Sequence, residues 1–126
     1  MKPALLLDTH IALWWFTADE HLPETERNLI VGSRCHVSLA SVWEVAIKYR
    51  LDKLPVSPKD FLEAIEGAAM RLLPIQPAHI VATTNLPMLH KDPFDRLLVA
   101  QSMTESLPLL TADASVAAYG GLIRLI

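Results

Sequence analysis

Short apolar runs, each followed by a stretch of helical composition, are the feature that most constrains the fold of this chain. The runs have the length and composition of buried strands; they are residues 4–7, 35–39, 72–75, 109–111 and 123–126. Helices are predicted between them over 10–16, 23–31, 40–51, 58–71, 78–85, 94–105 and 112–119. Strands that alternate with helices pair in parallel and carry helices on both faces. We therefore predict an α/β fold, a three-layer α/β/α sandwich around a central, mostly parallel sheet.

Composition limits the classes of protein to which the chain can belong. Its 126 residues are 52% apolar, enough to fill one core, so we treat 1–126 as a single domain. Eleven Lys and Arg against fourteen Asp and Glu give a net charge of −3, which argues against binding nucleic acid through bulk positive charge. The single cysteine, Cys35, excludes an internal disulfide and a Cys-based zinc cage. No apolar stretch has the length of a membrane span or an export signal, so a cytoplasmic location is expected.

Four acidic residues stand near the predicted strand ends. Asp8 and Asp113 close the first and fourth strands, and Glu44 lies one turn into the helix after the second strand. Because ligand sites of parallel sheets form at the carboxyl ends of the strands, these three acids are expected at one edge. Asp95 opens the helix 94–105, which has no obvious strand directly before it, so the pattern alone does not place it there.

Each acid also has a purely structural interpretation. Asp8 and Asp113 stand where a helix N-cap would, and Ser41-x-x-Glu44 matches a capping box. The segment 92–95, DPFD, combines a cap, a proline at the first helical position and an acid in the first turn. Gathered together, however, four carboxylates would repel one another, and a divalent cation such as Mg²⁺ or Mn²⁺ would remove that cost. Such a cation can also stabilise charge on a phosphoryl oxygen.

Four segments stand in the order LLLDTHIALWW, SVWEVAIKYRLDKL, HKDPFDRLLVAQ and LLTAD. In this order they resemble the PIN-domain ribonucleases, and most closely the VapC-type toxins of bacterial toxin–antitoxin systems. The resemblance covers nearly the whole chain, and DPFDRLL is its most specific part.

The resemblance implies a PIN-like fold and a particular ligand set. Asp8 and Asp95 would be the core ligands of Mg²⁺ or Mn²⁺, with Glu44 and Asp113 completing the site directly or through water. In such enzymes a metal-activated water cleaves RNA. The resemblance also implies a homodimer, and a cognate antitoxin protein that blocks the site until it is degraded.

Other polar side chains carry weaker predictions. Thr9 and Thr111 are expected to donate hydrogen bonds within the acidic site. The candidate RNA contacts are basic residues near the acids, with a solvated surface as the alternative; they are Lys48, Arg50, Lys53, Lys91 and Arg96. For Arg96 the further alternative is an ion pair with Asp92 or Glu105.

The histidines and the large aromatic side chains are given structural roles. His10 and His90 lie near the acids in the sequence but are expected to be loop or core residues, since an oxygen-only ligand set suits Mg²⁺ better. Core positions are expected for Trp14, Trp15, Phe16 and Trp43. Adjacent tryptophans on one helix cannot both point inward, so one of the first two is expected at an interface.

The leading hypothesis is thus a metal-dependent endoribonuclease that acts as a toxin. A receiver-like or phosphoryl-transfer domain is disfavoured, because the third predicted strand ends in Pro74-Ile75-Gln76 without the acid that a receiver needs. A haloacid-type phosphatase would have a second Asp where His10 stands. The non-enzymatic alternative is a PIN-like interaction module whose acids serve only as helix caps.

Overall fold

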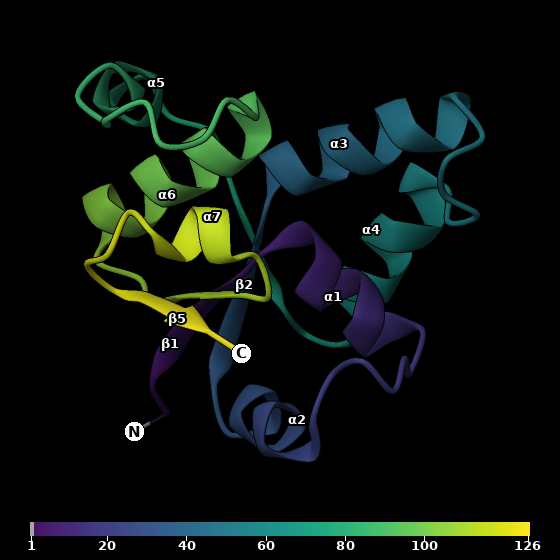
Figure 1. The fold of residues 1–126 in the computed structure, drawn as a ribbon. Coiled ribbons are helices and arrows are strands. Elements are labelled where there is room, and N and C mark those ends of the chain that lie inside the picture. Colours follow the sequence, from purple (N-terminus) through teal and green to yellow (C-terminus); the bar gives the residue numbers. More distant parts are fainter. Residues whose placement is uncertain (1) are drawn as a thin grey trace.

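A five-stranded sheet forms the centre of the computed structural model, which describes residues 2–126 (Figure 1). The strands are β1 (Ala4–Leu7), β2 (Arg34–Ser38), β3 (Arg71–Leu73), β4 (Leu109–Thr111) and β5 (Ile123–Leu125). Their order across the sheet is β3-β2-β1-β4-β5, and every neighbouring pair is parallel. The predicted α/β fold is confirmed, and all strand carboxyl ends lie at one edge of the sheet.

Helices connect the strands in the predicted order. They are α1 (Thr9–Phe16), α2 (Glu24–Val31), α3 (Leu39–Arg50), α4 (Pro58–Gly67), α5 (Pro77–Thr83), α6 (Pro93–Glu105) and α7 (Ala114–Ala117). Helix α4 ends earlier than predicted, because Ala69 adopts a left-handed φ of 56° just before β3 begins. Over residues 2–126, no helix has both the length and the apolar character that crossing a membrane requires.

The alternation of side chains along β1 creates two cores. Leu5 and Leu7 belong to a cluster that includes Phe61 of α4 and further residues of α1, α2 and α3. Leu6 points to the opposite face, into a cluster with Leu98 of α6 and residues of β4 and α7. Since each fully buried leucine contributes about 1.5–3 kcal/mol, the two clusters fix helices on both faces of the sheet. This is the predicted three-layer arrangement.

One aromatic residue departs from the predicted core. Trp43 is 60% exposed and makes an edge-to-face contact with Phe94 of α6, with ring centroids 5.3 Å apart. The buried positions of α3 are Ala40, Ser41, Glu44 and Val45, so residue 43 faces away from the sheet. The aromatic residues of α1, in contrast, are partly buried against the first cluster.

Candidate metal centre

Asp8 follows β1 directly and is almost completely buried, at 4% exposed. It caps α1, because Oδ1 accepts the backbone N–H of His10 at 2.7 Å. The other oxygen, Oδ2, accepts a hydrogen bond from the Thr111 hydroxyl at the end of β4, at 2.6 Å. Burial raises the pKa of the Asp8 carboxyl, and the hydrogen bonds from Thr111 and His10 oppose that shift. The predicted cap is therefore present, but it engages only one of the two carboxylate oxygens.

The start of α3 differs from the predicted capping box. The cap is Ser38, whose hydroxyl accepts the backbone N–H of Ala40 at 3.0 Å. Ser41 is already inside the helix, and its hydroxyl accepts a hydrogen bond from the Thr9 hydroxyl at 2.8 Å. The capping-box interpretation of Glu44 is thus wrong, because the helix begins three residues earlier than that box requires.

Glu44 lies one turn into α3 and is 3% exposed. Its Oε2 forms an ion pair with Lys48 Nζ at 2.6 Å, while its Oε1 has no hydrogen-bond partner among the described residues. Burial lowers the pKa of Lys48, but the hydrogen bond with Glu44 and the charges of Glu44, Asp92 and Asp95 outweigh this and raise it overall. A buried, unpartnered carboxylate oxygen is costly, and ligation of a cation would satisfy it.

Asp95 stands in the first turn of α6. The predicted cap is present before it: Asp92 accepts the backbone N–H groups of Phe94 and Asp95 at 2.8 and 3.1 Å. Burial, joined by the charges of Asp92, Asp8 and Glu44, raises the pKa of Asp95 to about 6, and the hydrogen bond with His90 opposes this shift. The structure therefore brings Asp95, which the strand pattern alone did not place, into the field of the other acids.

Asp113 follows β4 and is the most accessible of the four acids. It caps α7, accepting the backbone N–H of Ser115 at 2.8 Å, and its side chain is 45% exposed. Its own N–H donates to the Thr111 hydroxyl at 3.1 Å, and that hydroxyl donates in turn to Asp8. A cavity of about 320 Å³ is lined by Asp8 and Asp113, together with His10, Trp14 and Ala112.

The two predicted supporting threonines have different positions. Thr111 links Asp8 and Asp113 by the hydrogen bonds just described. Thr9 bonds to Ser41 and so ties the start of α1 to α3. Among the described hydrogen bonds, the Thr9 hydroxyl donates to no acidic side chain.

His90 lies in the site, although only a structural role was expected for it from the sequence. His90 Nε2 lies 2.7 Å from Asp95 Oδ2 and 3.9 Å from Asp113 Oδ2. One donor atom from each of His90, Asp95 and Asp113 lies within 4.8 Å of the other two. The available sequence signal was the position of His90 two residues before the DPFD helix start, where a loop side chain can reach the first turn of the helix.

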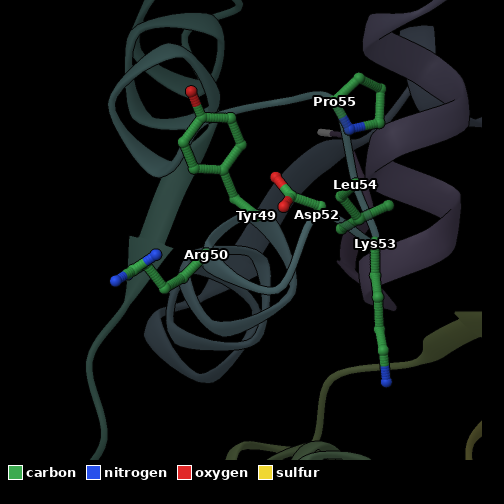
Figure 2. A pocket seen from close by; sticks show the side chains of 6 residues that line it. All are labelled: Tyr49, Arg50, Asp52, Lys53, Leu54 and Pro55. Carbon is green, nitrogen blue, oxygen red and sulfur yellow. The ribbon is translucent and has the colours of Figure 1, made fainter.

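The predicted RNA contacts are divided between α3, the loop after it, the loop before α6, and α6 itself. Lys48 forms an ion pair with Glu44, and Lys91 is an exposed residue of the loop that precedes α6. Figure 2 shows Arg50 and Lys53 extending in different directions beside a cavity of about 480 Å³ at the end of α3, whose lining includes none of the four acids. The charge of this region is therefore spread around the end of the helix.

Arg96 has an internal role in the structure. Its guanidinium donates to the carbonyl oxygens of Thr83 and Pro87, at 2.8 and 3.0 Å, and to the Tyr119 hydroxyl at 3.0 Å. The acids Asp92 and Glu105, considered as partners from the sequence, do not receive these bonds. A contact between Arg96 and RNA would require some of these bonds to break.

The donor chemistry of this edge fits a divalent cation. Carboxylate oxygens dominate it, two of the acids are almost fully buried, and one buried oxygen of Glu44 has no hydrogen-bond partner within residues 2–126. Burial is the main cause of the raised pKa of both Asp8 and Asp95, and for Asp95 the charges of Asp92, Asp8 and Glu44 add to it. Carboxylate oxygens are ligands that Mg²⁺ and Mn²⁺ bind, and the donor atoms of Asp95, Asp113 and His90 lie within 4.8 Å of one another.

Three solved structures resemble this fold over nearly all of the chain. A chain of a toxin–antitoxin complex from Klebsiella pneumoniae is 15% identical, with a TM-score of 0.66 and 95% of each chain covered. VapBC2 from Rickettsia felis, bound to a DNA fragment from its promoter, matches with 16% identity, a TM-score of 0.65 and coverage of 98% of this chain and 97% of that chain. DNA-bound VapBC from Salmonella typhimurium matches with 19% identity, a TM-score of 0.68 and coverage of 100% and 98%. At these identities the likeness establishes the fold alone.

The sequence itself also matches a family description. Among curated proteins, none matches this chain significantly. The PIN domain family model, in contrast, matches residues 5–122, which span β1 to the residue before β5 and include all four acids. This chain therefore belongs to the PIN domain family.

Proposed function

We propose that this chain is a Mg²⁺- or Mn²⁺-dependent endoribonuclease that acts as the toxin of a toxin–antitoxin pair. The proposal is supported by buried Asp8 and Glu44, whose charges raise the pKa of Asp95, and by Asp95 and Asp113, whose carboxylate oxygens lie within 4.8 Å of each other. Helix capping does not explain why Glu44 is buried with an oxygen that has no hydrogen-bond partner among the described residues.

Each residue of the proposed site would have its own role in catalysis. A bound divalent cation would supply charge stabilisation at the phosphoryl group and a more acidic water. Asp8 and Asp95 would be its core ligands, and Glu44 and Asp113 would complete the set directly or through water. Thr111 donates a hydrogen bond to Oδ2 of Asp8, and Lys48 balances the charge of Glu44.

The partners are proposed from the chain's relatives. The three similar structures are named as toxin–antitoxin or VapBC complexes, which supports a cognate antitoxin for this chain. A homodimer and a cytoplasmic location complete the proposal, as the family resemblance and the single unpaired cysteine suggest.

Cleavage of total RNA by the purified protein tests the proposal. Wild-type protein in Mn²⁺ should give discrete fragments, whereas EDTA and the variants Asp8→Asn and Asp95→Asn should abolish them. Asp60→Asn, at an exposed position in the first turn of α4, is the matched control and should cleave like wild type. Circular dichroism verifies that each variant is folded.

The opposite result has a specific meaning. If folded wild-type protein cleaves nothing in Mn²⁺ that it leaves intact in EDTA, the enzymatic proposal fails. Asp8 and Asp113 would then serve as helix caps, and the chain would be a PIN-fold interaction module.

A further inference from the structure

The loop that carries His90 is anchored from two other parts of the fold. The backbone N–H of His90 donates to the Tyr119 hydroxyl, which follows α7, at 3.0 Å. Arg96 of α6 donates to the same hydroxyl at 3.0 Å and to the Thr83 carbonyl oxygen at the end of α5 at 2.8 Å. A loop without regular structure is thus held against α6 and α7 at the residue that reaches the acidic cluster.

The imidazole of His90 points at two of the acids. Nε2 lies 2.7 Å from Asp95 Oδ2 and 3.9 Å from Asp113 Oδ2, and the side chain is only 24% exposed. The three donor atoms lie within 4.8 Å of one another. Ligands that bind one transition-metal ion at about 2.0–2.2 Å can be at most about 4.4 Å apart, so small side-chain movements would let all three bind it.

A second feature of the same edge also points to a ligand. Glu44 is 3% exposed, and its Oε1 has no partner within residues 2–126. Glu44 thus has a buried, unsatisfied oxygen, and its charge acts on Asp95, the residue that His90 contacts. Oxygen-only sets suit Mg²⁺, whereas an imidazole nitrogen favours first-row transition cations, in the order Mn²⁺ below Co²⁺ below Ni²⁺.

We propose that His90 supplies a nitrogen ligand, through Nε2, to the cation that Asp95 and Asp113 bind, so that this centre prefers transition cations to Mg²⁺. Ligation requires Nε2 to be unprotonated, so the ring carries its proton on Nδ1 and the Nε2 contact with Asp95 is exchanged for the bond to the cation. Arg96 and Tyr119 are the positioning residues of this ligand. The inference rests on the proposed function in one respect, namely that these acids bind a cation.

Electron spin-echo envelope modulation of the Mn²⁺-loaded protein detects a directly bound nitrogen. Wild type should show the ¹⁴N coupling of one imidazole, and His90→Asn should lose it. His10→Asn is the matched control, because His10 lines the neighbouring cavity with Asp8 and Asp113. That variant should retain the coupling.

Calorimetry with the cations alone separates ligation from a purely orienting role. Loss of a ligand should weaken Co²⁺ binding by about tenfold or more. Mg²⁺ binding should change much less in the same His90→Asn protein. Equal weakening of both cations would mean that His90 only orients Asp95, and it would overturn the proposal.

Failure of this inference can be told apart from failure of the proposed function. Cation binding and RNA cleavage without nitrogen coupling, or with coupling that survives His90→Asn, would refute the His90 ligand and leave the nuclease intact. If no cation binds to folded wild-type protein, the His90 ligand and the cation requirement of the nuclease both fail.

Discussion

The charge of Asp95 should destabilise the cation-free protein at neutral pH. Its pKa is raised to about 6 from an ordinary value of 3.8, first by burial and then by the neighbouring acids. At neutral pH this difference corresponds to at most about 3 kcal/mol. Because the side chain is 19% exposed and water screens part of the repulsion, we expect a cost of about 1–2 kcal/mol.

The pH dependence follows from the direction of the shift. Between pH 3.8 and about 6, the folded state binds more protons at Asp95 than the unfolded state does. The free energy of unfolding therefore falls as the pH rises through this window, and the cost is fully present above about pH 7. Asp8, whose pKa is also raised by burial, contributes in the same direction.

Urea denaturation in EDTA measures this cost. Asp95→Asn should be more stable than wild type by about 1–2 kcal/mol at pH 7.5, and the difference should shrink toward zero near pH 4. Asp52→Asn, at an exposed position with a left-handed φ of 57° that asparagine tolerates, is the matched control and should change stability by about 0.5 kcal/mol or less. The reasoning is refuted if Asp95→Asn is less stable than wild type at pH 7.5, or if its gain is the same at both pH values.

Three further predictions concern the same edge of the sheet. Mn²⁺ at 100 times its dissociation constant should stabilise the wild-type protein at pH 7.5 by about 2.7 kcal/mol in thermal or urea unfolding. Asp8→Asn should lose most of this stabilisation. Equal stabilisation of both proteins would place the cation elsewhere. Thr111→Val removes the hydroxyl donor that lies 2.6 Å from buried Asp8, and it should lower the free energy of unfolding in urea by about 1–3 kcal/mol. Thr111→Ser keeps the donor and should be close to wild type. Similar losses of stability in both variants would indicate packing as the cause instead. Tyr119→Phe should cost about 1 kcal/mol and speed hydrogen exchange at the His90 amide, and unchanged exchange would contradict the proposed anchoring of that loop.

The acids that end strands could be predicted from the sequence. Asp8 and Asp113 follow β1 and β4, and these strands are neighbours in the sheet, so local pattern and parallel pairing suffice to bring the two residues to one edge. The alternation of apolar runs and helices likewise predicted the order of all strands and helices along the chain. Helix ends were less predictable, as the early end of α4 shows, since they depend on single backbone angles such as that of Ala69.

Positions that depend on contacts between distant segments could not be predicted. Asp95 reaches the other acids because α6 packs across the sheet, which no local spacing encodes. His90 depends on Tyr119, which is 29 residues away in the sequence. The capping box at Ser41 was wrong because Ser38, an equally good cap, comes first and defines the start of α3.

The chemistry of the cut RNA ends tests the central claim most directly. An external water as nucleophile leaves no cyclic phosphate, whereas attack by the 2′-hydroxyl of RNA itself produces 2′,3′-cyclic phosphate ends. We predict Mn²⁺-dependent fragments without cyclic phosphate for wild type and none for Asp8→Asn or Asp95→Asn. Fragments with cyclic phosphate ends, or equal cleavage by the two variants, would contradict the account of a carboxylate-held cation as the centre of this protein's activity.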